Sequence, residues 1–207
     1  MKFIGIILLL LTSIFLIACS ANQASNKISN SELENLASKY GGVYVFNEKF
    51  EKEITTKEKI RREAELAIVN ASKTDAETRK NLKGFDTKYP QTLSNGKKYY
   101  TRWIDYENQT GKKAEIPEVY INKIKEFIGD DFNKQKPELL MLYLYEDNGI
   151  AIPITVRASY TYVKTKYGLF GDEGRGVKFS KQNFVTRTSR SEFHIINGKF
   201  ERVSKDK

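Results

Sequence analysis

The hydrophobic residues of this chain follow a mainly helical spacing in its first half and a mainly strand-like spacing in its second. Between residues 31 and 129, most apolar positions recur every three or four residues, in segments bounded by capping residues, glycines or proline. From residue 139 onward, apolar positions alternate with polar ones or form short runs between turn residues. This order predicts helices followed by consecutive strands.

Two helices are indicated in the first third of the chain. The segment 31–39 is short and closes on Gly41-Gly42. Farther along, Thr55 and Glu58 have the spacing of a capping box, in which each side chain accepts from the backbone N–H of the other residue. The helix that this box predicts would have one apolar face, formed by Ile60, Ala64, Ala67, Ile68 and Ala71.

Two further helices are indicated before the strands begin. Thr74 and Glu77 repeat the capping signal, and Gly84 is expected to end that short helix. Pro117 suits the first turn of another helix, and Gly129 suits its end. The apolar face of this last helix would consist of Tyr120, Ile124, Phe127 and Ile128.

Strand-like patterns occur in five segments. These are residues 43–46, 98–107, 139–145, 150–166 and 184–196. Pro153 lacks a backbone donor, so it predicts an edge or a bulge within the fourth segment. Asp147-Asn148-Gly149 and Asn197-Gly198 each predict a tight turn between two strands.

The fold predicted from these elements is of the α+β class. Because the long strands are joined by short turns, we expect N-terminal helices packed on one face of an antiparallel, curved sheet formed mainly by the C-terminal half. Residues 31–207 are expected to form one domain, since their number suits a single hydrophobic core. The element order resembles the cystatin-like and nuclear transport factor-like folds, which host many functions.

The N-terminus has the pattern of an export signal. Lys2 precedes an apolar stretch of fifteen residues, which would form a helix of about 22 Å, shorter than the roughly 30 Å hydrocarbon core of a bilayer. The stretch ends in Leu16-Ile17-Ala18-Cys19, which resembles the lipobox of bacterial lipoproteins. Cys19 is the single cysteine of the chain.

The resemblance to lipoproteins implies processing at this cysteine. Residues 1–18 would be removed by cleavage between Ala18 and Cys19, and Cys19 would carry lipid on its sulfur and on its new amine. Residues 19–30 would then be a lipidated, flexible tether, since they are small and polar. The protein would be attached to the bacterial cell envelope through acyl chains. Ser20, rather than Asp, would favour the outer membrane over the inner one in a bacterium with two membranes.

Composition excludes several kinds of chemistry. One cysteine cannot form an internal disulfide, and together with one histidine it cannot form a Cys/His zinc site. The net charge is +9 from 35 basic and 26 acidic residues, and it would be +8 after removal of the signal. Such a charge favours acidic partners, and an exported protein is not expected to bind nucleic acid.

Three patterns resemble catalytic motifs only weakly. The glycine-rich segment 168–176 carries Asp172 and Glu173, which would repel a phosphate, so it predicts a hairpin loop. His194 and Glu192 would share one face of a strand, but no strained turn presents Ser189 or Ser191 as a nucleophile. The acidic pairs 130–131, 146–147 and 172–173 suit solvated turns better than an acid–base site. No catalytic residue, metal ligand or cofactor is therefore predicted.

Basic and aromatic residues alternate in two segments. They are Lys97, Lys98, Tyr99, Tyr100, Arg102 and Trp103 in the first, and Tyr160, Tyr162, Lys164 and Lys166 in the second. Outside the cytoplasm this combination suits an acidic protein, an anionic glycan or an anionic lipid. Ordinary strand composition explains it equally well, since tyrosine is common in strands and lysine keeps sheet edges soluble.

Three functional hypotheses follow from the sequence. The first is a non-enzymatic envelope lipoprotein whose basic domain binds a protein partner, in an interaction, assembly or immunity role. The alternative is a module that binds glycan or lipid through Tyr and Trp side chains, which requires Trp103 to lie in a cleft. The third, an envelope hydrolase that uses His194 and Glu192, has the weakest support because no nucleophile or orienting motif accompanies them.

Overall fold

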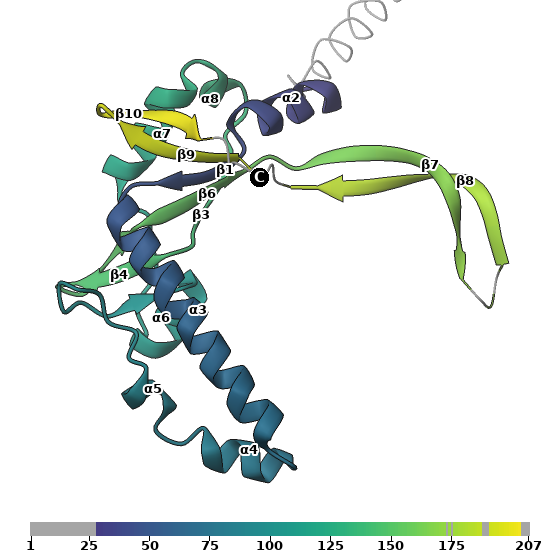
Figure 1. Cartoon of the computed structure of the whole chain (residues 1–207). Coiled ribbons are helices and arrows are strands. Elements are labelled where there is room, and N and C mark those ends of the chain that lie inside the picture. The colour runs from purple at the N-terminus through teal and green to yellow at the C-terminus, as the bar shows by residue number, and fades with distance from the viewer. Residues whose placement is uncertain (1–27, 173, 175, 188–190, 204–207) are drawn as a thin grey trace, which may run out of the picture.

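The computed structural model describes residues 28–172, 174, 176–187 and 191–203, and it is of the α+β class (Figure 1). Its helices are α2 (Asn30–Tyr40), α3 (Glu48–Ala71), α4 (Asp75–Asn81), α5 (Phe85–Lys88), α6 (Trp103–Thr110), α7 (Glu118–Ile128) and α8 (Asp131–Lys134). Its strands are β1 (Gly42–Val45), β2 (Tyr99–Tyr100), β3 (Glu138–Met141), β4 (Leu144–Asp147), β5 (Ile150–Pro153), β6 (Thr155–Ser159), β7 (Tyr162–Asp172), β8 (Gly176–Thr186), β9 (Ser191–Ile196) and β10 (Lys199–Val203).

A five-stranded sheet forms the centre of the body, in the order β10-β9-β1-β6-β3. Its neighbouring strands are antiparallel except β1 and β9, which are parallel. The strand from the helical half of the chain thus lies in the middle of strands from the other half. Side chains from α2, α7 and α8 pack on one face of this sheet (Figure 1).

Aromatic side chains dominate the core beneath these helices. Tyr44 of β1 is fully buried, and its ring stacks on Phe193 of β9 at 4.7 Å between centroids. Phe200 and Phe127 meet the same ring edge-on, at 5.0 and 5.9 Å. The Tyr44 hydroxyl donates to the Tyr40 carbonyl at 2.7 Å, so this polar group is satisfied inside the core.

A three-stranded sheet, β2-β4-β5, packs against the first turns of α3. Ile54 of α3 is fully buried there, together with Tyr99 of β2 and Ile154. The rest of α3 extends beyond the sheets, with α4 and α5 returning beside it (Figure 1). Arg61 ties this return to α3, since its guanidinium lies 2.7 Å from Asp86.

A two-stranded arm, β7–β8, projects from the body (Figure 1). Each strand has 11 residues, and at about 3.3 Å per residue the arm reaches roughly 35 Å. Near its tip a side chain at Gly171 is impossible, because a Cβ would lie 2.0 Å from the Gly176 carbonyl oxygen. The glycine-rich segment, predicted as a hairpin loop, is therefore mostly strand: residues 168–172 end β7 and Gly176 begins β8. The hairpin connection between two strands is confirmed, but the loop is shorter than predicted.

Most locally coded elements agree with the prediction. Thr74 caps α4, and Pro117 and Gly129 bound α7, as expected. A capping box of Ser29 and Glu32, which was not predicted, begins α2. The end of α4 was predicted wrongly, because the helix ends at Asn81 and Gly84 instead precedes α5. Both predicted tight turns are present, with positive φ at Asn148, Gly149, Asn197 and Gly198. The general order of helices first and strands afterwards is therefore confirmed.

Two other element boundaries were predicted wrongly. The helix expected from Thr55 begins at Glu48, because Asn47 caps it by accepting from the Phe50 N–H at 3.0 Å. Thr55 is then a mid-helix residue, and Ile60 on the predicted apolar face is half exposed. The segment predicted as a strand over 98–107 is strand only at Tyr99–Tyr100, with a single β-bridge from Lys98 to Thr92, and then forms α6.

The long strands were predicted without their breaks. Residues 139–145 divide into β3 and β4, which belong to different sheets, and 150–166 divide into β5, β6 and the start of β7. Pro153 ends β5, as its missing donor suggests. The segment 184–196 spans the end of β8 and the whole of β9.

Candidate functional site

The arm has two chemically different faces. Residues that oppose one another in the antiparallel register share a face, and these positions alternate along the arm. One face carries six large hydrophobic residues, which we call the apolar face: Val163, Tyr167, Leu169, Val177, Phe179 and Val185. The other residues on that face are Thr165, Gly171, Lys181 and Asn183. Thr165 and Asn183 are hydrogen-bonded to each other at 2.9 Å, and Lys181 stands opposite Tyr167.

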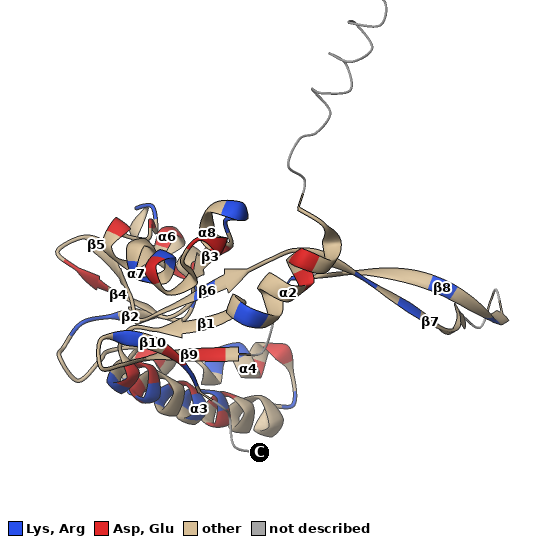
Figure 2. Cartoon of the chain, turned by 90° about the horizontal axis from the view of Figure 1, so that it is seen from above, with Lys and Arg blue, Asp and Glu red and all other residues tan. Residues whose placement is uncertain are grey.

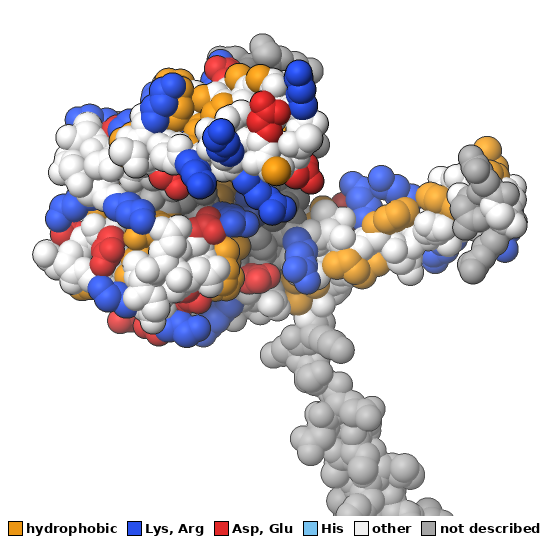
Figure 3. Space-filling model, turned by 90° about the horizontal axis from the view of Figure 1, so that it is seen from below, with side chains coloured by type: hydrophobic (Ala, Val, Ile, Leu, Met, Phe, Trp, Pro, Cys, Tyr) orange, Lys and Arg blue, Asp and Glu red, His pale blue; other side chains and the backbone are white. Residues whose placement is uncertain are grey.

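The apolar face is open to solvent. The exposed fraction of its six side chains runs from 39% at Val163 to 71% at Phe179. Hydrophobic side chains are visible along the arm in the space-filling view (Figure 3). A contiguous row of exposed apolar residues on a monomer marks an interaction site or an aggregation hazard.

The other side of the arm, the basic face, is partly covered by its own aromatic residues. It carries Lys164, Lys166 and Lys178, and lysines are visible on both strands (Figure 2). The rings of Phe170 and Phe184 lie 6.0 Å apart on this face, and Lys166 Nζ lies 5.5 Å from the Phe184 ring. The aromatic residues of this face therefore have partners within the arm.

The arm is fastened to the body at its root. The side chain of Asn30, at the start of α2, donates to the Val163 carbonyl at 2.9 Å and accepts from its N–H at 2.7 Å. Lys164 lies 3.9 Å from Glu34 of the same helix. Because α2 directly follows the predicted tether, the root of the arm lies close to the point where the tether enters the described domain.

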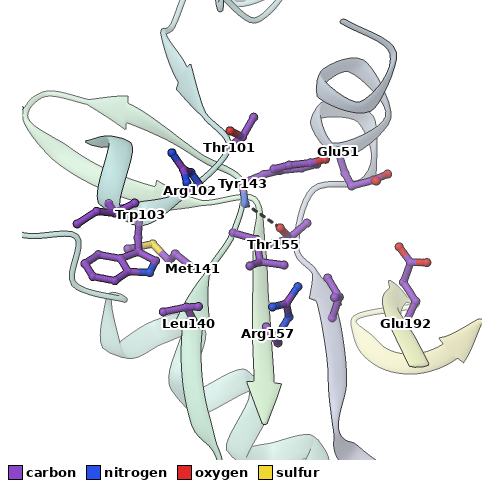
Figure 4. A pocket seen from close by; sticks show the side chains of 13 residues that line it. Glu51, Thr101, Arg102, Trp103, Leu140, Met141, Tyr143, Thr155, Arg157 and Glu192 are labelled. Atoms are coloured by element: carbon purple, nitrogen blue, oxygen red, sulfur yellow. Dashed lines mark hydrogen bonds between the residues drawn. The ribbon is translucent and has the colours of Figure 1, made fainter. Parts of the chain in front are cut away.

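A second feature is a cavity of about 510 Å³ on the body (Figure 4). Its floor is the five-stranded sheet, on the face opposite Tyr44, where Val43, Arg157 and Leu140 stand side by side on β1, β6 and β3. Trp103, at the start of α6, lines it together with Met141. This size falls within the range of about 300–1,000 Å³ that small-molecule sites occupy.

Arg157 is the unpaired charge of this cavity. It is half-buried, and its guanidinium forms no hydrogen bond or ion pair with any other described residue. The two carboxylates that line the same cavity already have partners: Glu51 accepts from the Thr55 hydroxyl at 3.1 Å, and Glu192 lies 3.7 Å from His194 Nε2. Among the described residues, the Arg157 guanidinium thus has no ion-pair partner, which is unusual for a guanidinium that is only partly hydrated.

The basic and aromatic residues singled out in the sequence do not form one surface. Tyr99, Tyr100 and Tyr160 are buried, and burial raises the pKa of all three phenols. The members that are exposed or partly buried separate into two groups, Lys97, Lys98, Arg102 and Trp103 on the body and Tyr162, Lys164 and Lys166 on the arm. The three buried tyrosines are therefore core residues and not contact residues.

The charged members on the body are largely paired. Lys97 lies 2.6 Å from Asp147, Lys98 donates to Gln109 at 2.7 Å, and Arg102 binds Asp105 through two hydrogen bonds. On the arm, Lys166 lies over the Phe184 ring. Of the residues in the first segment, Arg102 and Trp103 line the cavity, and Arg102 is already paired with Asp105.

The structure adds little support to the weak catalytic motifs noted in the sequence. His194 and Glu192 share a face of β9, as expected, with Glu48 3.9 Å from His194 Nδ1. Ser191 lies on the opposite face, and Ser189 falls outside the described residues. Within the described part of the chain, no three His, Cys, Asp or Glu side chains gather as metal ligands.

The predicted processing site, Ala18 and Cys19, lies outside the described residues. Every helix described from residue 28 onward is too short or too polar to span a membrane. The chain matches no protein-family model, no curated protein and no solved structure. The likeness to cystatin-like and nuclear transport factor-like folds thus remains one of element order.

Sequence reasoning missed the apolar face and Arg157. A signal existed for both. The pattern Val163-x-x-x-Tyr167-x-Leu169 keeps one parity along the strand, and Arg157 interrupts the apolar run between Val156 and Ala158. Neither signal says whether other parts of the chain cover these side chains.

Proposed function

We propose that this protein is a membrane-anchored lipoprotein of the bacterial cell envelope, and that its β7–β8 arm binds an acidic protein partner. The observation that carries the proposal is the exposed apolar face. A two-stranded ribbon is at best marginally stable alone in water, so a ribbon of this length with six uncovered hydrophobic side chains is best explained by a binding partner.

The open edges of the arm favour a protein over a lipid surface. Within the described residues, neither β7 nor β8 pairs with a third strand. Unpaired backbone groups are costly in hydrocarbon, whereas a protein partner satisfies them by adding a strand or by supplying side chains. A protein groove therefore suits this ribbon better than insertion into a bilayer.

Charge favours a foreign partner over a second copy. Lys181 stands opposite Tyr167 in the middle of the apolar face. Two arms packed through this face would bring two copies of Lys181 into one apolar interface, where like charges are costly. An apolar groove bordered by carboxylates would instead pair with Lys181 and with the lysines of the basic face.

The anchor and the arm fit one geometry. Cys19 and Ser29 are ten positions apart, and a flexible chain of that length has a root-mean-square span of about 18 Å. Since α2 begins at Asn30 and Asn30 binds the root of the arm, a lipid on Cys19 would keep the arm within a few nanometres of the membrane. The partner would thus be an envelope or secreted protein near that surface. The domain itself is proposed to act without catalysis.

Site-specific photocrosslinking tests the arm proposal in cells that express the full chain. A crosslinker at Val177 should capture one acidic protein, and a crosslinker at Lys83, an exposed turn residue after α4, should not. The double variant Leu169→Asp with Phe179→Asp should abolish capture. A variant that adds the same two charges to exposed positions of the body, Asn81→Asp with Thr87→Asp, should retain it.

The identity of the captured molecule decides the outcome. Capture of one acidic protein, weakened at high salt and lost in the apolar-face variant, is the expected result. Capture of lipid alone, of a second copy alone, or equal capture by both double variants would overturn the proposal. Anchoring is tested separately: Cys19→Ser should lose metabolic acyl label and leave the membrane fraction.

A further inference from the structure

We propose that the cavity beside Trp103 binds one unit of an acidic sugar, with its carboxylate on Arg157 and one face of its ring against the Trp103 indole. This site is separate from the arm, since its lining residues come from α3, α6, the adjoining loops and the five-stranded sheet of the body. The two proposals therefore fail independently.

Arg157 supplies the anion-binding part of the site. A half-buried guanidinium without a counterion is the group in this cavity with the most to gain from a ligand. Its planar fork of N–H donors matches a carboxylate, to which it forms paired, charge-assisted hydrogen bonds. Neighbouring Val43 and Leu140 are apolar and do not compete for it.

Glu51 and Glu192 restrict the charge of the ligand. Both carboxylates line the same cavity as Arg157 (Figure 4). They would repel a doubly charged phosphate, because Arg102, the other cation that lines the cavity, is already bound to Asp105, and two carboxylates then face the single guanidinium of Arg157. Carboxylates accept hydrogen bonds from hydroxyl groups, so they suit a ligand with one negative charge and several hydroxyls.

Trp103 supplies the apolar wall. Its ring is partly buried, and in Figure 4 it lies beside Leu140 and Met141. A sugar ring presents C–H groups on its faces and hydroxyls at its rim, which matches an indole wall, a basic floor and carboxylates across the cavity. An acidic sugar therefore meets the chemistry of each part of the site.

The full chain in detergent contains a built-in reporter, because Trp103 is its single tryptophan. We expect galacturonate to shift the Trp103 emission with saturation, and galactose and inorganic phosphate to bind at least about tenfold more weakly. Polygalacturonate distinguishes the source: binding of the polymer but not the monomer assigns the site to a polysaccharide, and binding of both assigns it to the sugar acid itself.

Substitution of the arginine sharpens the test. Arg157→Gln should weaken galacturonate binding about tenfold or more, Arg157→Lys should restore part of it, and Lys83→Gln should leave it unchanged. If Arg157→Gln does not fold, the comparison of galacturonate with galactose on the unmodified chain still decides. Equal response to the two sugars, tighter binding of phosphate, or undiminished binding by a folded Arg157→Gln variant would overturn the proposal.

Discussion

The body and the arm are both built from β-strands with alternating side chains, yet these side chains have opposite environments. Along β1 and β6, the apolar residues Tyr44, Val156 and Ala158 are fully buried beneath helices. Along β7, which follows β6 after two residues, the alternate positions Tyr167 and Leu169 are about two-thirds exposed. The same sequence pattern thus forms a core in one region and a surface in the other.

The difference shows that alternation determines which residues share a face and not what covers that face. In the body, α2, α7 and α8 supply the covering side chains. The arm extends beyond all of them, and its apolar face has no such cover among the described residues. Stability is therefore expected to depend on the body, and binding on the arm.

The largest expected effect concerns the free energy of unfolding, and it is tested by replacing one aromatic residue in each region. Tyr44→Ala should lower the free energy of unfolding by about 3–5 kcal/mol, because it removes a fully buried ring and leaves a cavity. Phe179→Ala should change it by less than about 0.5 kcal/mol, since that ring has few neighbours. Urea unfolding followed by circular dichroism measures both. A cost above about 2 kcal/mol for Phe179→Ala would show that the arm is covered in solution.

The second test concerns the lysine within the apolar face. Lys181→Leu completes an uninterrupted hydrophobic row and removes the charge that opposes pairing of two copies. We expect self-association to tighten by at least about tenfold, as measured by sedimentation at several protein concentrations. Lys178→Leu removes the same charge from the basic face and serves as the control. Equal tightening by both variants would mean that net charge, and not this face, controls association.

Local signals made much of the fold predictable from the sequence. The Asn148-Gly149 and Asn197-Gly198 turns need residues that tolerate positive φ, and both turns occur where expected. The secondary structure of residues 103–110 was harder to predict. Trp103 and Tyr106 are compatible with an aromatic strand and also with the i, i+3 spacing of a helix. Gly111 at the C-cap is the residue that favours the helix. The breaks within 150–166 were hidden because alternation continues across them, and the break within 139–145 was hidden because that segment is apolar throughout.

The candidate sites were predictable only in part. The glycan-binding hypothesis required Trp103 to lie in a cleft, and Trp103 does line a cavity. The signal for it in the sequence was an amphipathic ring beside charged residues. Arg157 completes that cavity through register: β1 and β3 place Val43 and Leu140 on either side of it. Such neighbours come from residues more than 100 and about 17 positions away, and a single sequence does not reveal that pairing.

A third, smaller effect is expected where the two regions meet. Asn30→Ala removes both hydrogen bonds to Val163 and should lower the local free energy of opening at the root of β7 by about 1 kcal/mol. Hydrogen exchange of the amides near Val163 measures it, with Asn35→Ala on the same helix as the control. Unchanged exchange in Asn30→Ala would mean that the arm is held by other contacts, such as Lys164 with Glu34.

The smallest expected effect is a pH dependence confined to the body. Asp131 accepts hydrogen bonds from Lys134 at 2.7 Å and from the Tyr40 hydroxyl at 3.0 Å, and these contacts lower its pKa. Because the folded state binds this proton less readily than the unfolded state, the contribution of Asp131 to stability is present above about pH 4 and is lost as pH falls through the lowered pKa.

This pH dependence is expected in the body and not in the arm. Unfolding in urea at a series of pH values should show a shallower loss of stability between about pH 4 and pH 2 for Asp131→Asn than for the unmodified chain or for Asp130→Asn. Amide exchange in β7 and β8 should be unaffected by Asp131→Asn, once corrected for the intrinsic effect of pH. If Asp131→Asn loosens the arm as much as it changes the body, α2 transmits strain between them, and the division between a stable body and an independent binding arm is wrong.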